Sequence, residues 1–476
     1  MKRFLALLTL IVTILFSFSS CSLILDILPI ILEYMGVGDT GVEIPDDGDG
    51  VHDVDFTKAK NVKDVTDQGY YLDGCPTVGS PGVLVIPVDF SDVTAKSKGY
   101  NISAIKNAFE KGGKCDYYSV YDYYYISSYG KLSLDITVLD FWFRPKYAST
   151  YYENYTEGDF LDEMAIGDQL VMDEALAYLE DRMDLSKFDS DKNGIIDSVV
   201  LITTLDIGED DFHWAYRYWN FYTDNSGNYY EYDGVSANDY LWASYEFLFE
   251  DEDGEFSDKS AMNTFTYIHE FGHILGADDY YDTAGIEDPL AGCDIMDAMS
   301  GDHNAFTKFN YGWLTTSRLV TTEDSVTLTL GSFTKSGDTI ILANTWDDAL
   351  GAYQEYYIVV YYRKTGLNGT VNGTEYGYFA RDGIVVYHVN ASLLEDNFGG
   401  EILYDLANNN TNYLDDFGTR NNLIEYVMSK NDTYTYVVGD SLPTVINDRG
   451  RVLEYTFTVD ALEGDTATLT FTKKAE

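Results

Sequence analysis

The residues best suited to chemistry lie in one short stretch that begins at His269 and reads HEFGHILGADD. Residues four apart lie on one face of an α-helix, so His269 and His273 can direct two imidazoles at one metal ion. Glu270 follows the first histidine, where its carboxylate can reach a metal-bound water. A helix end at Gly276 would turn the chain back and offer Asp279 as a third ligand. The fourth position would stay open, as a catalytic zinc site requires.

The residues around the motif are typical of a helix that could hold it. Apolar side chains recur there at helical spacing, at Met262, Phe265, Ile268 and Leu275. The alternative is a core helix whose two histidines are satisfied by ordinary hydrogen bonds. The chain has only six histidines, and Gly276 and Asp279 stand in register with the two used here. The pattern therefore favours a zinc site.

The overall charge is strongly negative. Lys and Arg number 30 and Asp and Glu number 80, which gives a formal net charge of −50. Such a surface repels nucleic acid and anionic lipid headgroups, so no nucleic-acid partner is expected. At 476 residues the chain can bury a large core in two or three domains, and its four cysteines are too few for a disulfide scaffold.

Residues 1–21 have the layout of a lipoprotein signal peptide. Two basic residues precede an apolar run, and small residues then lead to Cys21. Lipidation of Cys21 would hold the protein outside a bacterial cell, attached to the membrane through that lipid alone. Because Phe18 stands where the lipidation pattern usually has Leu, an ordinary signal peptide or an uncleaved anchor is the alternative. Residues 22–74 predict a flexible acidic tether or a short pro-segment.

Residues 75–316 carry alternating strand and helix signals and are expected to form the domain that holds the motif. Expected strands cover residues 83–90, 131–138 and 198–203, and expected helices cover residues 102–111 and 159–184. Tyrosine-rich runs such as residues 116–125 are interpreted as sheet edges or contact surfaces. Met296 is either the tight turn found beneath metzincin-type zinc sites or a core methionine.

The stretch FDSDKNGIID, residues 188–197, resembles the first part of a calcium-binding loop. Oxygen ligands stand at alternate positions around a glycine that permits a sharp turn, in the set Asp189, Asp191, Asn193 and Asp197. The twelfth position, normally a bidentate acid, is Val200, and a strand is expected to follow in place of a second helix. The loop is therefore either a calcium site or an Asx-rich turn that leads into a strand.

Residues 317–476 are expected to form a β-rich, sandwich-like C-terminal domain. Short strand-forming runs cover residues 325–330, 339–343, 356–362, 383–388 and 455–459. Turn signals such as Asn368-Gly369 separate several of them. The predicted fold class of the whole chain is therefore α+β.

Five segments, taken in order, resemble the immune-inhibitor-A-like family of secreted bacterial zinc metallopeptidases. They read VLVIPVDFSD from residue 83, SSYGKLSLD from residue 127, FDSDKNGIIDSVVLI from residue 188, HEFGHILGADDYYD from residue 269 and DIMDAMSGDHNAFTKFNYGW from residue 294. The zinc motif alone is shared with other clans, whereas the ordered set is more specific.

The resemblance implies a zincin- or metzincin-like domain, with a mixed sheet and an active-site helix, and extracellular hydrolysis of a protein or peptide substrate. It implies that His269, His273 and Asp279 bind zinc and that Glu270 is the general base. This sequence departs from the family at GADD, where the family commonly has a proline before its aspartate. Asp278 is therefore a rival third ligand.

The expected chemistry is peptide-bond hydrolysis by a water that zinc acidifies to a pKa of about 7. Glu270 would take the proton and return it to the leaving amine. A second group should stabilise the oxyanion, with Tyr280, Tyr281 and His303 as candidates. The alternatives are a catalytically inactive surface lipoprotein used for binding or adhesion, and a calcium-stabilised structural lipoprotein with an accidental motif. Retention of Glu270 argues against a pure binder.

Overall fold

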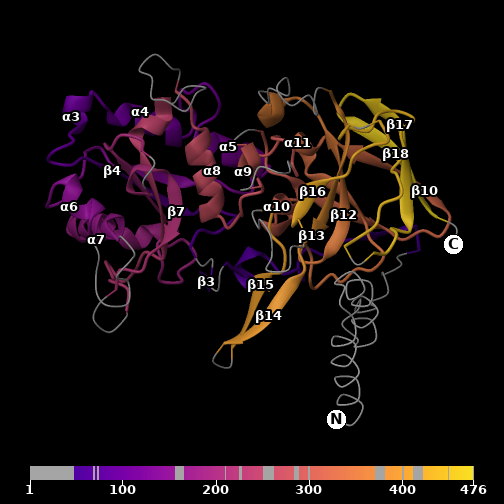
Figure 1. The fold of residues 1–476 in the computed structure, drawn as a ribbon, viewed down its shortest axis with the longest axis horizontal. Coiled ribbons are helices and arrows are strands. Elements are labelled where there is room, and N and C mark those ends of the chain that lie inside the picture. Colours follow the sequence, from indigo (N-terminus) through magenta and orange to yellow (C-terminus); the bar gives the residue numbers. More distant parts are fainter. Residues whose placement is uncertain are drawn as a thin grey trace, which may run out of the picture.

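The computed structural model describes residues 48–67, 70–71, 74–155, 166–208, 211–223, 228–249, 262–282, 289–298, 301–369, 381–398, 401–410, 422–431, 433–448 and 450–474. It shows the α+β class that the sequence predicts, with one half built on a helix-covered sheet and the other half mainly of strands (Figure 1). Cys21 and the rest of the signal region lie outside the described residues. Within them, no helix is both long enough and apolar enough to cross a membrane.

The first half is organised by a five-stranded sheet of order β5-β4-β6-β8-β7. Its strands are β4 (Gly82–Val88), β5 (Asp135–Val138), β6 (Ser198–Thr203), β7 (Tyr216–Trp219) and β8 (Asp239–Ser244). Strands β5, β4, β6 and β8 are parallel, and β7 is antiparallel to β8 at the edge. Both β4 and β6 are buried along their whole length, which explains their uninterrupted apolar sequences.

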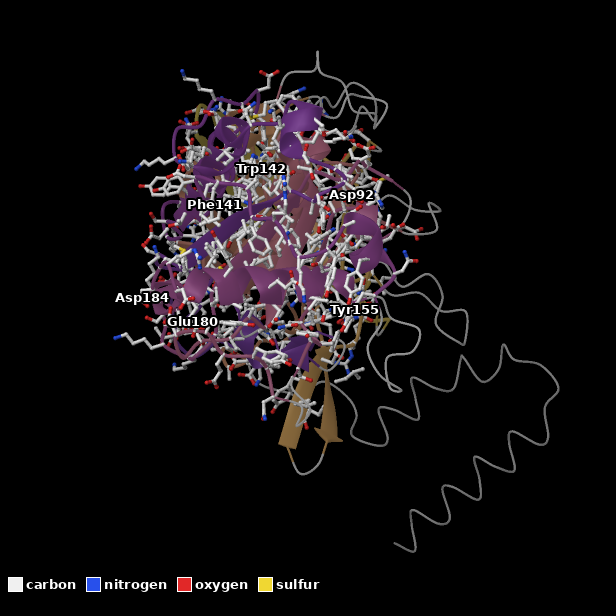
Figure 2. The ribbon with its side chains drawn as sticks, turned by 90° about the vertical axis from the view of Figure 1, so that its left-hand side faces the viewer. Asp92, Phe141, Trp142, Tyr155, Glu180 and Asp184 are labelled. Atoms are coloured by element: carbon white, nitrogen blue, oxygen red, sulfur yellow. The ribbon has the colours of Figure 1, made fainter. Side chains whose placement is uncertain are left out.

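Helices cover both faces of this sheet. Val83 and Val85 belong to the same apolar cluster as α4 (Ile102–Phe109), α5 (Val120–Ser127) and α8 (Phe265–Ile274). Leu84 and Ile86, which point to the other face, pack with α7 (Gly167–Glu180). Two short helices, α3 (Ala95–Lys98) and α6 (Ser149–Glu153), complete this half. Figure 2 looks onto its outer end, where Asp92, Phe141 and Glu180 are exposed.

The interpretation of the tyrosine-rich run as a sheet edge is wrong. Ser119 accepts a hydrogen bond from the backbone N–H of Asp122 and begins helix α5, in which Tyr123 and Tyr124 are fully buried. Their hydroxyls donate to the carbonyl oxygens of Gly301 and Ile268. Tyrosine fits here because its ring fills the core while its hydroxyl still finds a partner.

The second half contains two sheets that enclose an apolar cluster. The six-stranded sheet has the order β1-β9-β11-β12-β13-β16 and the three-stranded sheet the order β10-β18-β17. Their bounds are β1 (Val51–Asp53), β9 (Thr316–Val320), β10 (Ser325–Gly331), β11 (Asp338–Leu342), β12 (Glu355–Tyr362), β13 (Gly383–Asn390), β16 (Ile424–Tyr426), β17 (Tyr455–Glu463) and β18 (Thr466–Lys473). Val359 and Val386 from one sheet meet Phe457 and Leu469 from the other. Helices α9 (Ile295–Ala298) and α10 (Ala305–Asn310) connect the two halves, and α11 (Phe333–Ser336) lies between β10 and β11.

The described part of the predicted tether or pro-segment is folded against the rest of the protein. Strand β1 pairs with β9 at the edge of the six-stranded sheet, and Val54, Val62 and Val65 are buried. Further along, β2 (Thr66–Asp67) and β3 (Tyr70–Tyr71) join a hairpin of the second half, β14 (Leu393–Phe398) and β15 (Glu401–Leu406), in one four-stranded sheet. The prediction of a flexible tether is therefore wrong for this part of the segment. It was based on overall composition, and a few buried apolar residues are enough to hold the segment against the protein.

Candidate metal centre

Helix α8 carries the two histidines of the motif into the middle of the first half. Asn263 accepts a hydrogen bond from the backbone N–H of Phe265, where the helix begins. The helix packs against strands β7 and β8. It ends before Gly276, whose φ of +96° lies in the left-handed region that glycine adopts without strain. The chain turns back there and brings Asp279 towards His269 and His273.

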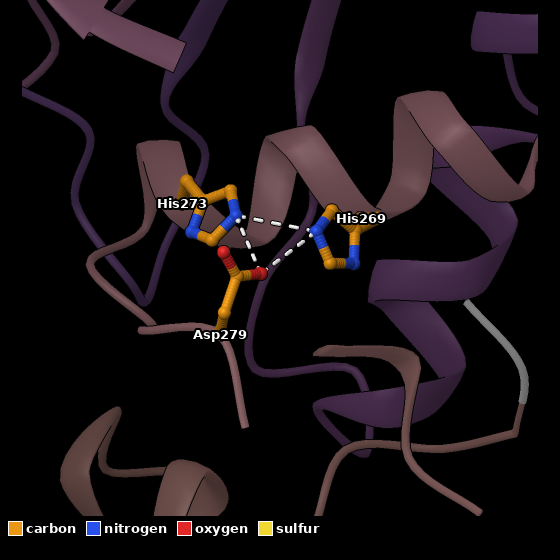
Figure 3. Close-up of side chains that lie close together, drawn as sticks. All are labelled: His269, His273 and Asp279. Carbon is orange, nitrogen blue, oxygen red and sulfur yellow. Dashed lines mark hydrogen bonds and ion pairs between the residues drawn. The ribbon is translucent and has the colours of Figure 1, made fainter. Parts of the chain in front are cut away.

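Three ligand atoms converge beyond this turn (Figure 3). His269 Nε2 and His273 Nε2 lie 3.3 Å apart, and Asp279 Oδ1 lies 3.0 Å from the first and 3.2 Å from the second. Ligands about 2.0–2.1 Å from a tetrahedral zinc ion lie about 3.3 Å from one another. The triangle therefore has the size of three corners of a zinc site.

The other nitrogen of each imidazole is fixed by a backbone carbonyl. His269 Nδ1 donates to the oxygen of Ile295 and His273 Nδ1 to that of Ala277, each over 2.8 Å. With Nδ1 protonated, the neutral rings direct their Nε2 lone pairs towards the carboxylate of Asp279. Three acceptors that face one another repel unless a cation or a proton lies between them. The donor set, two imidazoles and one carboxylate, fits zinc.

The close approach of these groups shifts the pKa values of His273 and Asp279. Burial opposes the charged form of His273, but the Asp279 carboxylate raises its pKa to about 9. Burial also opposes ionisation of Asp279, yet the two imidazoles hold its pKa well below the usual range. A metal ion would take over the role of this shared proton, so metal binding should release it.

Glu270 lies beside the ligand triangle in an open cleft of about 730 Å³. Burial raises the pKa of its carboxyl, which makes Glu270 a better proton acceptor than an exposed glutamate. The cleft is bordered by the edge strand β7 and by parts of the N-terminal segment and of the β14–β15 hairpin. Its lining residues outside the motif include Val62, Val65, Tyr218, Asp405 and Leu406.

The two candidate third ligands, Asp278 and Asp279, lie differently with respect to the imidazoles. Asp278 lines the cleft, but the carboxylate that meets both imidazoles belongs to Asp279. The three candidate oxyanion donors also differ in whether they reach the cleft. Tyr280 is buried and bonds Thr307 through its hydroxyl, and His303 is buried among aromatic rings. Only Tyr281 of the three lines the cleft, and its hydroxyl donates to Asp279 Oδ2 over 2.9 Å.

Met296 lies in the short helix α9, which packs directly behind α8. Its side chain is fully buried, and its carbonyl oxygen accepts a hydrogen bond from the backbone N–H of Tyr280. The preceding residue, Ile295, supplies the carbonyl that orients His269. The segment around Met296 therefore supports the first histidine ligand from behind. The sequence alone could not have identified the carbonyls of Ile295 and Ala277, because any residue type supplies one.

In the candidate calcium loop, carboxylate oxygens of Asp189, Asp191 and Asp197 lie within 4.8 Å of one another. Hydrogen bonds from backbone N–H groups to these side chains also stabilise the conformation of the loop. Asp189 accepts from the backbone N–H groups of Asn193 and Gly194, and Asp197 accepts from those of Gly82 and Ser190. Asn193 accepts from the N–H of Ile195, and Lys63 forms an ion pair with Asp191 over 2.8 Å. The loop thus has the hydrogen bonds of an Asx-rich turn and, at the same time, three carboxylates that could hold Ca²⁺.

No protein-family model matches this chain, and no curated protein matches it. The geometry of this site and the sequence motifs are therefore the features that indicate a function.

Proposed function

We propose that the protein is a zinc-dependent endopeptidase that works outside the cell. One observation carries the proposal: the acceptor atoms of His269, His273 and Asp279 converge at 3.0–3.3 Å beside the carboxylate of Glu270, at the wall of an open cleft. A cation fits the three converging acceptors, and the neighbouring base fits hydrolysis. The resemblance to immune-inhibitor-A-like metallopeptidases points to the same reaction.

Zinc bound by these three residues would supply a Lewis acid and acidify a water. The protein's own groups perform the remaining tasks. Glu270 accepts the proton of the attacking water and returns it to the leaving amine, a role that typically accounts for a factor of about 10²–10⁴ in rate. The carbonyls of Ile295 and Ala277 hold both imidazoles in the tautomer that presents Nε2. Tyr281 lines the cleft and its hydroxyl orients Asp279, so that it could stabilise negative charge on a substrate only by giving up this hydrogen bond.

The cleft suits an extended segment of polypeptide. Strand β7, at the edge of the five-stranded sheet, borders the cleft, and a segment of substrate could pair along this edge as an added strand. Such pairing does not require a chain terminus, which favours an endopeptidase acting on protein or peptide substrates. Export with a lipid anchor at Cys21 and calcium in the 189–197 loop belong to the same proposal.

The alternative is an inactive surface lipoprotein that uses the cleft for binding or adhesion. Zinc content and casein cleavage should be measured for the exported chain and for Glu270→Gln, which keeps the size of the side chain and removes the base. We expect about one zinc at the motif in both proteins, and a rate of cleavage lower by about 10²–10⁴ in the variant. Zinc without cleavage in either protein would favour the binder, and absence of zinc from the motif would refute the proposal.

A further inference from the structure

A second cluster of metal-ligating side chains lies in the other half of the protein, on strands β12, β13 and β16, which are neighbours in the six-stranded sheet (Figure 1). In the strand register His388 lies directly opposite Tyr357 on one side and Glu425 on the other. Glu355 stands two residues before Tyr357 and therefore points to the same face of the sheet. Asp448 reaches this face from a loop.

The distances show how closely these groups are gathered. His388 Nε2 lies 3.1 Å from Glu355 Oε1, and His388 Nδ1 lies 3.1 Å from Glu425 Oε1. One ligand atom from each of Glu355, His388 and Asp448 falls within 4.8 Å of the other two. The side chains of Glu355 and His388 are only 10% and 6% exposed.

We propose that Glu355, His388 and Asp448 bind a second divalent transition-metal ion, for which Zn²⁺ is the natural candidate. Imidazole and carboxylate together are ligands that such ions accept. Glu425 would accept the Nδ1 proton of His388 and leave Nε2 free for the metal, the carboxylate–histidine–metal arrangement common in metal sites. Asn390 donates to Asp448 Oδ2 over 2.6 Å and so positions the third ligand.

The charge of the cluster distinguishes this site from a simple ion pair. Two carboxylates, those of Glu355 and Asp448, lie beside one imidazole, so even a protonated His388 leaves these three groups with a net charge of −2 + 1 = −1. Among the described residues, no lysine or arginine forms an ion pair with Glu355 or Asp448. A divalent ion beside neutral His388 would bring the charge of the three groups and the ion to −2 + 2 = 0, and it would do so where Glu355 and His388 are already shielded from water.

The position of the site indicates a structural role for the ion. Asn390 ends β13, and the hairpin β14–β15 begins three residues later. Asn408, which follows that hairpin, donates to the carbonyl of Asn390 over 2.8 Å. A metal ion would therefore join β12, β13 and the loop at Asp448 at the base of the hairpin. Its expected effect is stabilisation, and it does not depend on the catalytic proposal.

The test uses the full chain with His269→Ala and His273→Ala, which removes the first metal centre. After chelation and dialysis this variant is titrated with Zn²⁺ against a chromophoric chelator, and its Tm is recorded. We expect about one zinc per chain and a rise in Tm of at least about 2 °C. Adding His388→Gln should abolish both effects. Adding His213→Gln should change neither, because His213 bonds the backbone carbonyl of Asp206 outside both clusters.

Two outcomes would overturn the inference: no zinc bound by the variant that lacks the first centre, or full zinc affinity after His388→Gln. If His388→Gln disturbs the near-ultraviolet circular dichroism of the protein, Asp448→Asn decides instead. Asp448 lies in an exposed loop, so this change should leave the fold intact while lowering the zinc affinity at least 10-fold. Unchanged affinity in Asp448→Asn would refute the site.

Discussion

Gly272, in the middle of helix α8, lies directly against the sulfur of Met296. A Cβ atom at position 272 would come within 2.4 Å of Met296 Sδ, closer than real atoms approach. The glycine of HEFGH therefore leaves room for the Met296 side chain, and with it for helix α9, behind the two histidines. Helix α9 also carries the Ile295 carbonyl that orients His269.

Gly272→Ala should destabilise the protein by about 1–3 kcal/mol, because the added methyl group overpacks the contact with Met296. Alanine is otherwise the better helix former by about 1 kcal/mol, so a loss of stability would identify the clash. In a Met296→Ala background the same change should cost at least about 1 kcal/mol less, and urea unfolding of the four proteins measures this coupling. An equal cost in both backgrounds would show that the two residues do not interact in this way.

Asp279→Ala should lower the zinc affinity of the first centre at least about 100-fold, because it removes the carboxylate that meets both imidazoles. Asp278→Ala is the matched control: the same residue type, adjacent in sequence and lining the same cleft. It should retain nearly full affinity in the same chelator competition. The opposite ranking of the two variants would assign the third ligand to Asp278.

Tyr281→Phe should weaken zinc binding about 10-fold, because it removes the hydroxyl that holds Asp279 Oδ2. If Tyr281 also stabilises the oxyanion, kcat should fall at saturating zinc as well. Tyr280→Phe is the control, since that hydroxyl bonds Thr307 in the core and does not reach the cleft. Affinity and kcat both equal to those of the unmodified protein would exclude Tyr281 from the site.

Stability should depend on pH through Asp294. Burial raises the pKa of Asp294 from 3.8 to about 7, although it accepts backbone hydrogen bonds from Met296 and Asn304. The folded protein therefore binds this proton more tightly than the unfolded chain, and the resulting stability is lost as pH rises through 7. Relative to Asp294→Asn, the unmodified protein should lose about 3 kcal/mol between pH 5 and pH 8.

Urea unfolding at both pH values checks the Asp294 prediction. Replacement by Asn also removes one of the two hydrogen bonds that Asp294 accepts, but the resulting loss of folding stability does not change with pH. Asp324→Asn serves as control, because Asp324 is exposed and its replacement should show no such trend. A pH-independent difference for Asp294→Asn would contradict the prediction.

The convergence of His269, His273 and Asp279 could be predicted from the sequence because these residues lie close together in the chain. His269 and His273 are related by one helical turn, and Gly276 marks the reversal that returns Asp279. The buried strands β4 and β6 were equally predictable, since their apolar runs continue without interruption. In each case neighbouring residues determine the geometry, with little contribution from distant parts of the chain.

Contacts over long sequence separations could not be predicted in this way. Strand β1 pairs Val51 with Val320, and His388 meets Glu355 and Glu425 only because three strands align in one register. The composition of residues 22–74 predicts a flexible tether, yet Val54, Val62 and Val65 are buried. The prediction that the tyrosine-rich run forms a sheet edge is wrong because strand propensity depends on what packs around a residue.

The contact of Phe309 with Trp346 and Tyr356 has a practical consequence for protein engineering. Phe309 belongs to α10, next to the half that contains α8, and stacks on Trp346 at 6.3 Å between ring centroids. The same apolar cluster also contains Ile268 of α8 and Ile358 of β12. A chain truncated near residue 316 would leave this surface bare and prone to aggregation. The half that contains α8 is therefore not expected to fold on its own, and calorimetry should show both halves melting in a single transition.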